Sequence, residues 1–172
     1  MSSPRYLEPD SRMTLREALA ELRELEADVS DETIGDDLTK ALIAHDVVHI
    51  LFGCDISDDD EVIAHLWMVV GTDARLGDMR AIARDRDHIG YARSFAHGRR
   101  VLLVLRNLPR MLGTVIRARR MTKFWPFGGF EENLDRTLAD LRAEYGITVP
   151  APGSRRQGRR GPHHPAYLPA TR

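Results

Sequence analysis

The stretch that decides the fold is LTKALIAHDVVHILFGCDISDDDEV, residues 38–62. Residues 38–52 are apolar around most of a helical wheel, which is typical of a helix buried on all sides. Gly53 suits the end of that helix, and Ser57 followed by the acidic run 58–60 predicts the start of the next one. We expect the acidic run to cap its helix and to face water. A buried helix with two histidines and an aspartate must offer these groups a partner.

The three polar side chains lie within about a quarter of the helix circumference. With His45 at zero and steps of about 100°, His49 falls near 40° and Asp46 near 100°. Histidines four residues apart can both bind one divalent metal ion, although a pair of hydrogen-bonded core histidines is the alternative. A further ligand would be Asp46 or Glu61, and an unbound Asp46 could instead orient a histidine. The donor set suits zinc, iron or manganese, with magnesium a further candidate.

His65 follows Glu61 by one helical turn and can therefore face the same site. We expect it either to transfer a proton there or to be an ordinary hydrogen-bonded histidine.

Helical signals also cover the rest of the chain. Thr14 and Glu17 form a potential capping box before a leucine-rich helix. No useful stretch alternates with the period of a strand. The sequence predicts one all-α domain at 14–148, with antiparallel or oblique packing between a flexible N-terminus at 1–13 and a disordered Pro/Gly/Arg-rich tail at 149–172. Besides the two central helices, at 38–52 and 59–70, we expect helices at 75–86, at 89–123 with a break near Pro109, and at 131–145 before Gly146.

Composition limits the function classes. Cys54 is the only cysteine of the 172 residues, which excludes an intrachain disulfide and a multi-cysteine metal site. No apolar run is long enough to span a bilayer. The net charge of −1 averages opposite blocks: 10 basic against 21 acidic groups in 1–96, eight against none in 97–125, and seven against five afterwards. The middle block therefore suits an anionic partner.

The basic block is also amphipathic. Leucines and valines occupy the other faces of the expected helix, and Phe124, Trp125 and Phe127 follow it. Basic amphipathic helices beside aromatic residues bind anionic membrane surfaces. A core helix with its basic face toward water has the same pattern, and the segment could also line an isoprenoid tunnel or bind a lipid phosphate. The arginines that gather near one face are Arg99, Arg106, Arg110, Arg117 and Arg120.

The spacing H-D-x-x-H-(x)11-E, formed by His45, Asp46, His49 and Glu61, resembles the signature of the ubiquinone (coenzyme Q) biosynthesis family commonly called Coq-four. The segment LADLRAEYGI, residues 138–147, is similar to that family's closing helix. The resemblance covers about residues 15–147. It implies that all four signature residues bind the metal, usually zinc.

The resemblance also implies an all-α protein that associates peripherally with membranes. It implies removal of the C1 carboxyl of a polyprenylated hydroxybenzoate, with or without coupled ring hydroxylation, and a role in organising other quinone-biosynthesis proteins. A bacterial relative is expected because no organelle-targeting segment is seen. Such a protein would be cytoplasmic and peripheral on the inner face of the cell membrane, with a second copy of the chain as a further partner.

Two other function classes stay open. One is a non-catalytic prenyl-lipid-binding scaffold with a structural metal, which would leave no exchangeable coordination position. The other is a metal-dependent phosphohydrolase that draws ligands such as His88 and His97 from distant helices. Nucleic acid is not an expected partner, because no recognised nucleic-acid motif is present.

Overall fold

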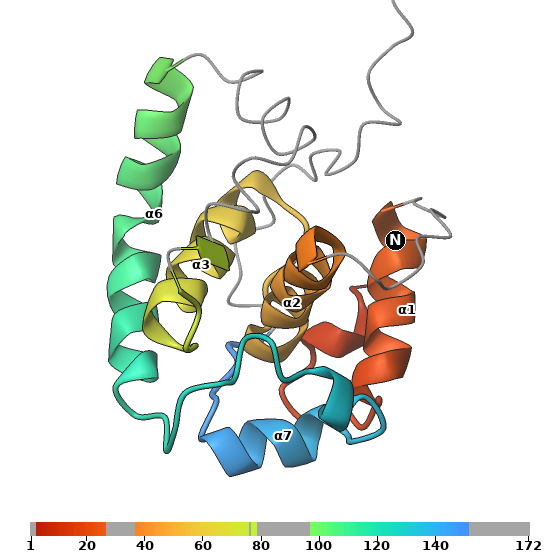
Figure 1. Cartoon of the computed structure of the whole chain (residues 1–172). Helices are drawn as coiled ribbons and strands as arrows, with labels where there is room; N and C mark the ends of the chain where they lie inside the picture. The colour runs from red at the N-terminus through yellow and green to blue at the C-terminus, as the bar shows by residue number, and fades with distance from the viewer. Residues whose placement is uncertain (1–2, 27–36, 76, 79–96, 152–172) are drawn as a thin grey trace, which may run out of the picture.

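The computed structural model describes residues 3–26, 37–75, 77–78 and 97–151 (Figure 1). These residues form an all-α arrangement, as the sequence predicts. The elements are η1 (Arg5–Leu7), α1 (Leu15–Glu26), α2 (Asp37–Phe52), α3 (Asp58–Val70), α6 (His97–Ala118), η2 (Glu131–Asn133) and α7 (Leu138–Tyr145).

Helix α2 lies at the centre of this arrangement. It packs against α1 on one side and α3 on another, and α7 and η1 also contact it. Helix α6 packs on α3, so α6 and α1 lie at opposite sides of the molecule (Figure 1). The apolar surface around most of α2 explains this position, because each side needs a covering element.

The expected helix starts at Thr14 and Ser57 and the expected end at Gly53 are confirmed. The expected break near Pro109 and the expected end at 123 are wrong, because α6 continues through Pro109 and ends at Ala118. The Thr14 backbone nitrogen donates to the Glu17 carboxylate over 2.8 Å, and the Glu17 nitrogen donates to the Thr14 hydroxyl over 3.2 Å. The Ser57 hydroxyl accepts from the Asp60 nitrogen and starts α3. Gly53 follows α2 with a φ of 66°, a left-handed conformation that glycine adopts without strain.

The expected helix at 131–145 is wrong in its first half. Residues 131–133 form the short η2, and α7 begins only after Thr137, whose hydroxyl accepts from the Asp140 nitrogen. Backbone pairing with the segment before α1 prevents a continuous helix. The Leu15 nitrogen donates to the Arg136 carbonyl, and the Leu138 nitrogen donates to the Met13 carbonyl.

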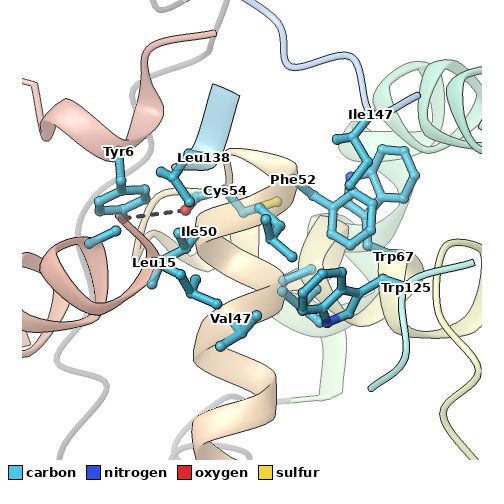
Figure 2. Packing of buried hydrophobic residues seen from close by; sticks show 14 of the residues in the cluster. Tyr6, Leu15, Val47, Ile50, Phe52, Cys54, Trp67, Trp125, Leu138 and Ile147 are labelled. Atoms are coloured by element: carbon cyan, nitrogen blue, oxygen red, sulfur yellow. Dashed lines mark hydrogen bonds between the residues drawn. The ribbon is translucent and has the colours of Figure 1, made fainter. Parts of the chain in front are cut away.

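The expected flexible N-terminus at 1–13 is also wrong for its described part. Tyr6 and Leu7 are buried in the core, where the Tyr6 hydroxyl donates to the Cys54 carbonyl over 3.4 Å (Figure 2). Val149 is buried as well, so the packed part extends beyond the expected boundary at 148. The predicted helix at 75–86 lies mostly outside the described residues, and residues 152–172 of the predicted disordered tail lie wholly outside them.

Aromatic packing fixes α3 against the end of α2. The Phe52 ring stacks on the Trp67 indole with centroids 4.2 Å apart and 17° between the planes (Figure 2). Gly71, which ends α3, is needed at this point: a Cβ there would lie 2.7 Å from an atom of the Trp67 ring. The end of α2 is therefore packed against the last turns of α3.

One buried arginine joins distant parts of the chain. Arg142 of α7 is 3% exposed, and its guanidinium lies where α2 ends and the N-terminal segment passes. A positive charge is favourable at the C-terminal end of a helix, where unpaired carbonyl groups gather. The guanidinium donates to five backbone carbonyl oxygens, those of Tyr6 (2.7 Å), Glu8 (2.5 Å), Pro9 (3.3 Å), Ile50 (2.8 Å) and Leu51 (3.0 Å).

We predict that Arg142→Met lowers the free energy of unfolding by about 3 kcal/mol or more, because several buried carbonyl groups lose a charged donor at once. Urea unfolding followed by circular dichroism measures the effect. Arg23→Met, which removes an exposed arginine of α1, is the matched control and should leave the midpoint unchanged. Equal midpoints for the two variants would contradict the role given to Arg142.

Candidate metal centre

Two histidines of α2 and the first glutamate of α3 meet inside the domain. Nε2 of His49 lies 3.1 Å from one carboxylate oxygen of Glu61, and Nε2 of His45 lies 3.5 Å from the other. The two imidazole rings pack edge to face with centroids 4.8 Å apart. All three residues are buried. The histidine spacing on α2 and the short loop to α3 are what bring them together.

The environment favours a charged Glu61. Burial by itself acts to raise the pKa of a carboxyl group. Here the effect of His45, His49 and His65 is larger, so the pKa of Glu61 lies well below its usual value. A carboxylate that stays ionised in a buried position is suited to bind a cation.

The geometry of the three donors fits a metal ion. One ligand atom from each of His45, His49 and Glu61 can be chosen so that all lie within 4.8 Å of one another. In a tetrahedral zinc site with bonds of about 2.1 Å, neighbouring ligand atoms are about 3.4 Å apart. The contacts of 3.1 Å from His49 and 3.5 Å from His45 run to different carboxylate oxygens of Glu61 and are of the same order. The group could therefore hold a metal ion.

His65 lies at the outer edge of the group. Its Nδ1 atom is 3.2 Å from a Glu61 carboxylate oxygen and 2.9 Å from the Glu61 backbone oxygen. Its ring centroid is 5.1 Å from that of His45. The side chain is 49% exposed, in contrast to the buried pair on α2. His65 therefore connects the group with solvent.

Asp46 does not join the other three signature residues. It is half-buried, a quarter turn around α2 from His45, and the cluster of potential ligands contains only His45, His49 and Glu61. Of the four ligands that the resemblance implies, the structure thus brings three together. A role for Asp46 stays a prediction.

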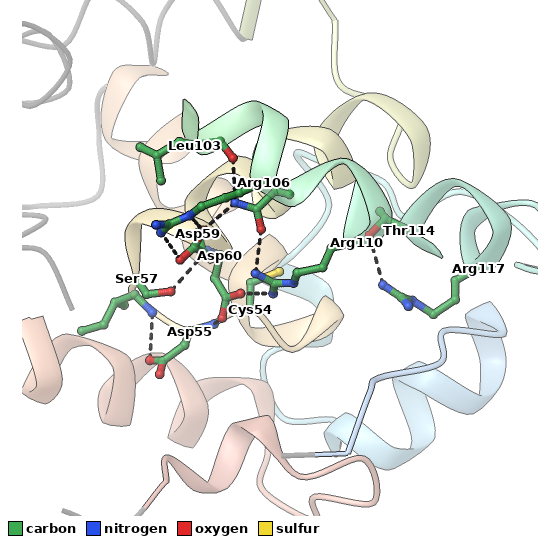
Figure 3. Close-up of polar contacts among 12 residues, drawn as sticks. Cys54, Asp55, Ser57, Asp59, Asp60, Leu103, Arg106, Arg110, Thr114 and Arg117 are labelled. Atoms are coloured by element: carbon green, nitrogen blue, oxygen red, sulfur yellow. Dashed lines mark hydrogen bonds and ion pairs between the residues drawn. The ribbon is translucent and has the colours of Figure 1, made fainter. Parts of the chain in front are cut away.

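The turn of α3 that carries Glu61 is held by charged contacts that the sequence did not predict. Asp58, Asp59 and Asp60 are 7%, 3% and 2% exposed, which corrects the expectation that they face water. Asp60 accepts from the Asp55 nitrogen over 2.7 Å. Buried carboxylates need cations, and α6 supplies them to Asp59 and Asp60 (Figure 3).

Two arginines of α6 provide those cations. Arg106 binds Asp59 through two contacts, one of them 2.7 Å long, and Arg110 forms an ion pair with Asp60 (Figure 3). The Asn107 amide adds a 2.5 Å contact to Asp59. The burial of Asp59 acts to raise its pKa, but the hydrogen bonds from Arg106 and Asn107 outweigh it, so the pKa is lowered. Opposite charge blocks in the sequence were the available signal for this contact.

The remaining arginines of the basic face differ from this pair. Arg117 is half-buried, donates to the Thr114 hydroxyl over 3.0 Å and lies over the Trp67 ring at 5.8 Å. Burial lowers its pKa, and Cys54 and Arg110 act on it in opposite directions. Arg120 is exposed, and the side chain of Arg99 lies outside the described part of the molecule. The four described arginines of the set therefore do not form one lipid-facing surface.

No family model, no curated protein and no solved structure matches the chain. The fold and the site define an all-α domain with a candidate metal centre. The resemblance to the ubiquinone-biosynthesis family, carried by the signature spacing and by residues 138–147, stays a prediction from the sequence.

We predict about one divalent metal ion per purified chain, measured by elemental analysis, and its loss in Glu61→Gln, which removes the negative ligand. Asp46→Asn is the matched carboxylate variant on the neighbouring helix. It should keep the metal, because Asp46 is not among the three converging donors. Full occupancy in Glu61→Gln would rule out this centre, and metal loss in Asp46→Asn would add Asp46 to its ligands.

Proposed function

We propose that this chain is a metal-dependent decarboxylase of quinone biosynthesis that acts on a polyprenylated hydroxybenzoate at a membrane surface. The observation that carries the proposal is the convergence of His45, His49 and Glu61 from the spacing H-D-x-x-H-(x)11-E. The spacing is the basis of the family resemblance. The convergence of the three side chains means that residues at this spacing could bind one metal ion.

The donor set favours a catalytic over a structural metal. Within the described residues, His45, His49 and Glu61 are the donors that would hold the ion, and three protein ligands leave a position for substrate or water. Two imidazoles and a carboxylate suit zinc, which we take as the first candidate, and equally iron or manganese. A divalent cation held here would orient the substrate and stabilise negative charge that develops on its ring.

The proposed decarboxylation requires no oxidant. The bond between the ring and the carboxyl carbon breaks, CO₂ leaves, and the electron pair stays on the ring carbon. That carbon then takes one proton. His65 is the residue to deliver it, because its ring lies beside His45 while nearly half of its side chain is open to solvent. Water returns the proton to His65. A decarboxylation coupled to hydroxylation would require O₂ as a second substrate.

The polyprenyl tail of such a substrate belongs in a membrane. Among the described residues, no helix is long and apolar enough to cross a bilayer. We therefore propose peripheral association, on the cytoplasmic face in a bacterial cell, with other quinone-biosynthesis proteins as partners at the same surface.

A prenyl-lipid-binding scaffold with a structural metal is the second candidate. Structural zinc sites are closed by four protein ligands, whereas three donors converge in the described part of this chain. This difference favours the enzyme.

We predict that the metal-loaded protein releases CO₂ from a prenylated 4-hydroxybenzoate in detergent micelles and yields the ring-protonated product. His65→Gln should lower kcat by about a hundredfold, the usual scale for loss of a proton donor, with metal content unchanged. His49→Ala should lose both metal and activity. A metal-loaded protein that binds the prenylated acid without releasing CO₂ would support the scaffold and contradict the enzyme.

A further inference from the structure

Helix α6 has two chemically different faces, and its apolar face points away from the protein. The face toward α3 carries Arg106, Asn107 and Arg110, which bind the carboxylates of Asp59 and Asp60. Asn107 and Thr114 on that face are 1% and 0% exposed. A helix on the surface of a globular domain normally buries its apolar stripe, so this orientation is inverted.

The outer face is a continuous apolar row. Positions 101, 105, 108, 112 and 116 recur at helical spacing and lie on one side of α6. The row is about 22 Å long at 1.5 Å per residue. Exposed contiguous apolar surface of this kind marks an interaction site. Its members, with flanking residues, are Val101 (58% exposed), Leu102 (60%), Val104 (42%), Leu105 (56%), Leu108 (49%), Leu112 (64%) and Ile116 (43%).

We infer that this row of α6 docks on a lipid bilayer, with its leucines in the boundary between headgroups and acyl chains. The surroundings of the row are complementary in charge to an anionic membrane. No aspartate or glutamate occurs from residue 97 to residue 130. Exposed Arg119 and Arg120 follow the row directly, and Phe124 beyond them is 62% exposed. Cations at the edge of an apolar helix face bind anionic headgroups, and an aromatic ring suits the same depth.

A specific partner helix fits the row less well. Helix pairs select their partners through charged residues that flank the apolar seam. Here flanking positions are also apolar, among them Leu102 and Val104. Such a broad apolar face suits contact with the apolar phase of a bilayer, because it has no charged residues that would fix the register of a partner helix.

The biological role of this docking rests on the proposed function, whereas the exposed apolar row that supports it does not depend on that function. Arg106 and Arg110 tie α6 to the turn of α3 that carries Glu61. Packed helices lie about 10 Å apart. Docking of α6 would therefore hold the metal centre close to the bilayer, within reach of a ring whose prenyl tail stays among the lipids. Arg106 and Arg110, which were assigned to the membrane from the sequence, instead hold α6 against α3. The apolar row makes the contact with the bilayer.

The test is co-sedimentation with vesicles of phosphatidylcholine alone and of phosphatidylcholine mixed with phosphatidylglycerol. The combined variant Leu105→Ser, Leu108→Ser, Leu112→Ser should lose about a hundredfold in partition on both, because three exposed leucines no longer enter lipid. Arg119→Gln with Arg120→Gln is the charge control and should weaken binding only to the anionic vesicles. Circular dichroism checks that the serine variant folds, and light scattering gives the oligomeric state of each protein.

A fluorophore at Leu112→Cys provides an independent readout, since the native Cys54 is buried. Its emission should shift to shorter wavelength on vesicles, whereas a label at Glu24→Cys on α1 should not shift. Vesicle binding equal to wild type in the serine variant would overturn the inference. The inference would also be overturned if the wild-type protein were a dimer that does not bind vesicles and the serine variant were a monomer. That result would mean that a second copy of the chain packs on the apolar row.

Activity in detergent separates the two claims. The serine variant should keep its metal and its decarboxylation in micelles. Vesicle binding without any decarboxylation would leave the docking intact and contradict the proposed function alone.

Discussion

Helix α2 is covered by α1, α3, α7 and η1, and its two buried histidines need polar partners inside that cover. The carboxylate of Glu61 meets both of them. A buried carboxylate would be costly alone, and the imidazoles that surround it lower its pKa well below the usual value. The contact between α2 and the first turn of α3 therefore positions the loop between these helices and the stacked rings of Phe52 and Trp67. Through Asp59 and Asp60, it also positions helix α6.

The acidic start of α3 has two roles at once. Glu61 turns toward α2 and the histidines, while Asp59 and Asp60 turn toward α6 and its arginines. Consecutive residues of a helix point about 100° apart, so a short acidic run can serve two neighbouring helices. The apolar side of α6 is left outward as a consequence. The same helical turn thus connects the candidate metal centre with the helix that forms the outer surface.

Local patterns predicted the parts of the structure that depend on local physics. The capping box of Thr14 and Glu17, the Ser57 cap and the three converging donors all follow from spacing along one helix or across a short loop. Contacts between distant segments could not be predicted in this way. In the sequence, Arg142 resembles an ordinary surface arginine. Its burial follows from contacts with α2 and the N-terminal segment, which lie far from it along the chain. The faces of α6 were ambiguous, because an amphipathic pattern does not say which face packs.

The central claim is that one metal ion lies between α2 and α3. Crystals of the metal-loaded protein, with anomalous diffraction recorded on both sides of the absorption edge of the bound metal, test it most directly. The account predicts one strong anomalous peak within coordination distance of His45, His49 and Glu61, with room for a further ligand. A peak elsewhere in the molecule, or no peak while the three side chains keep their contacts, would contradict it.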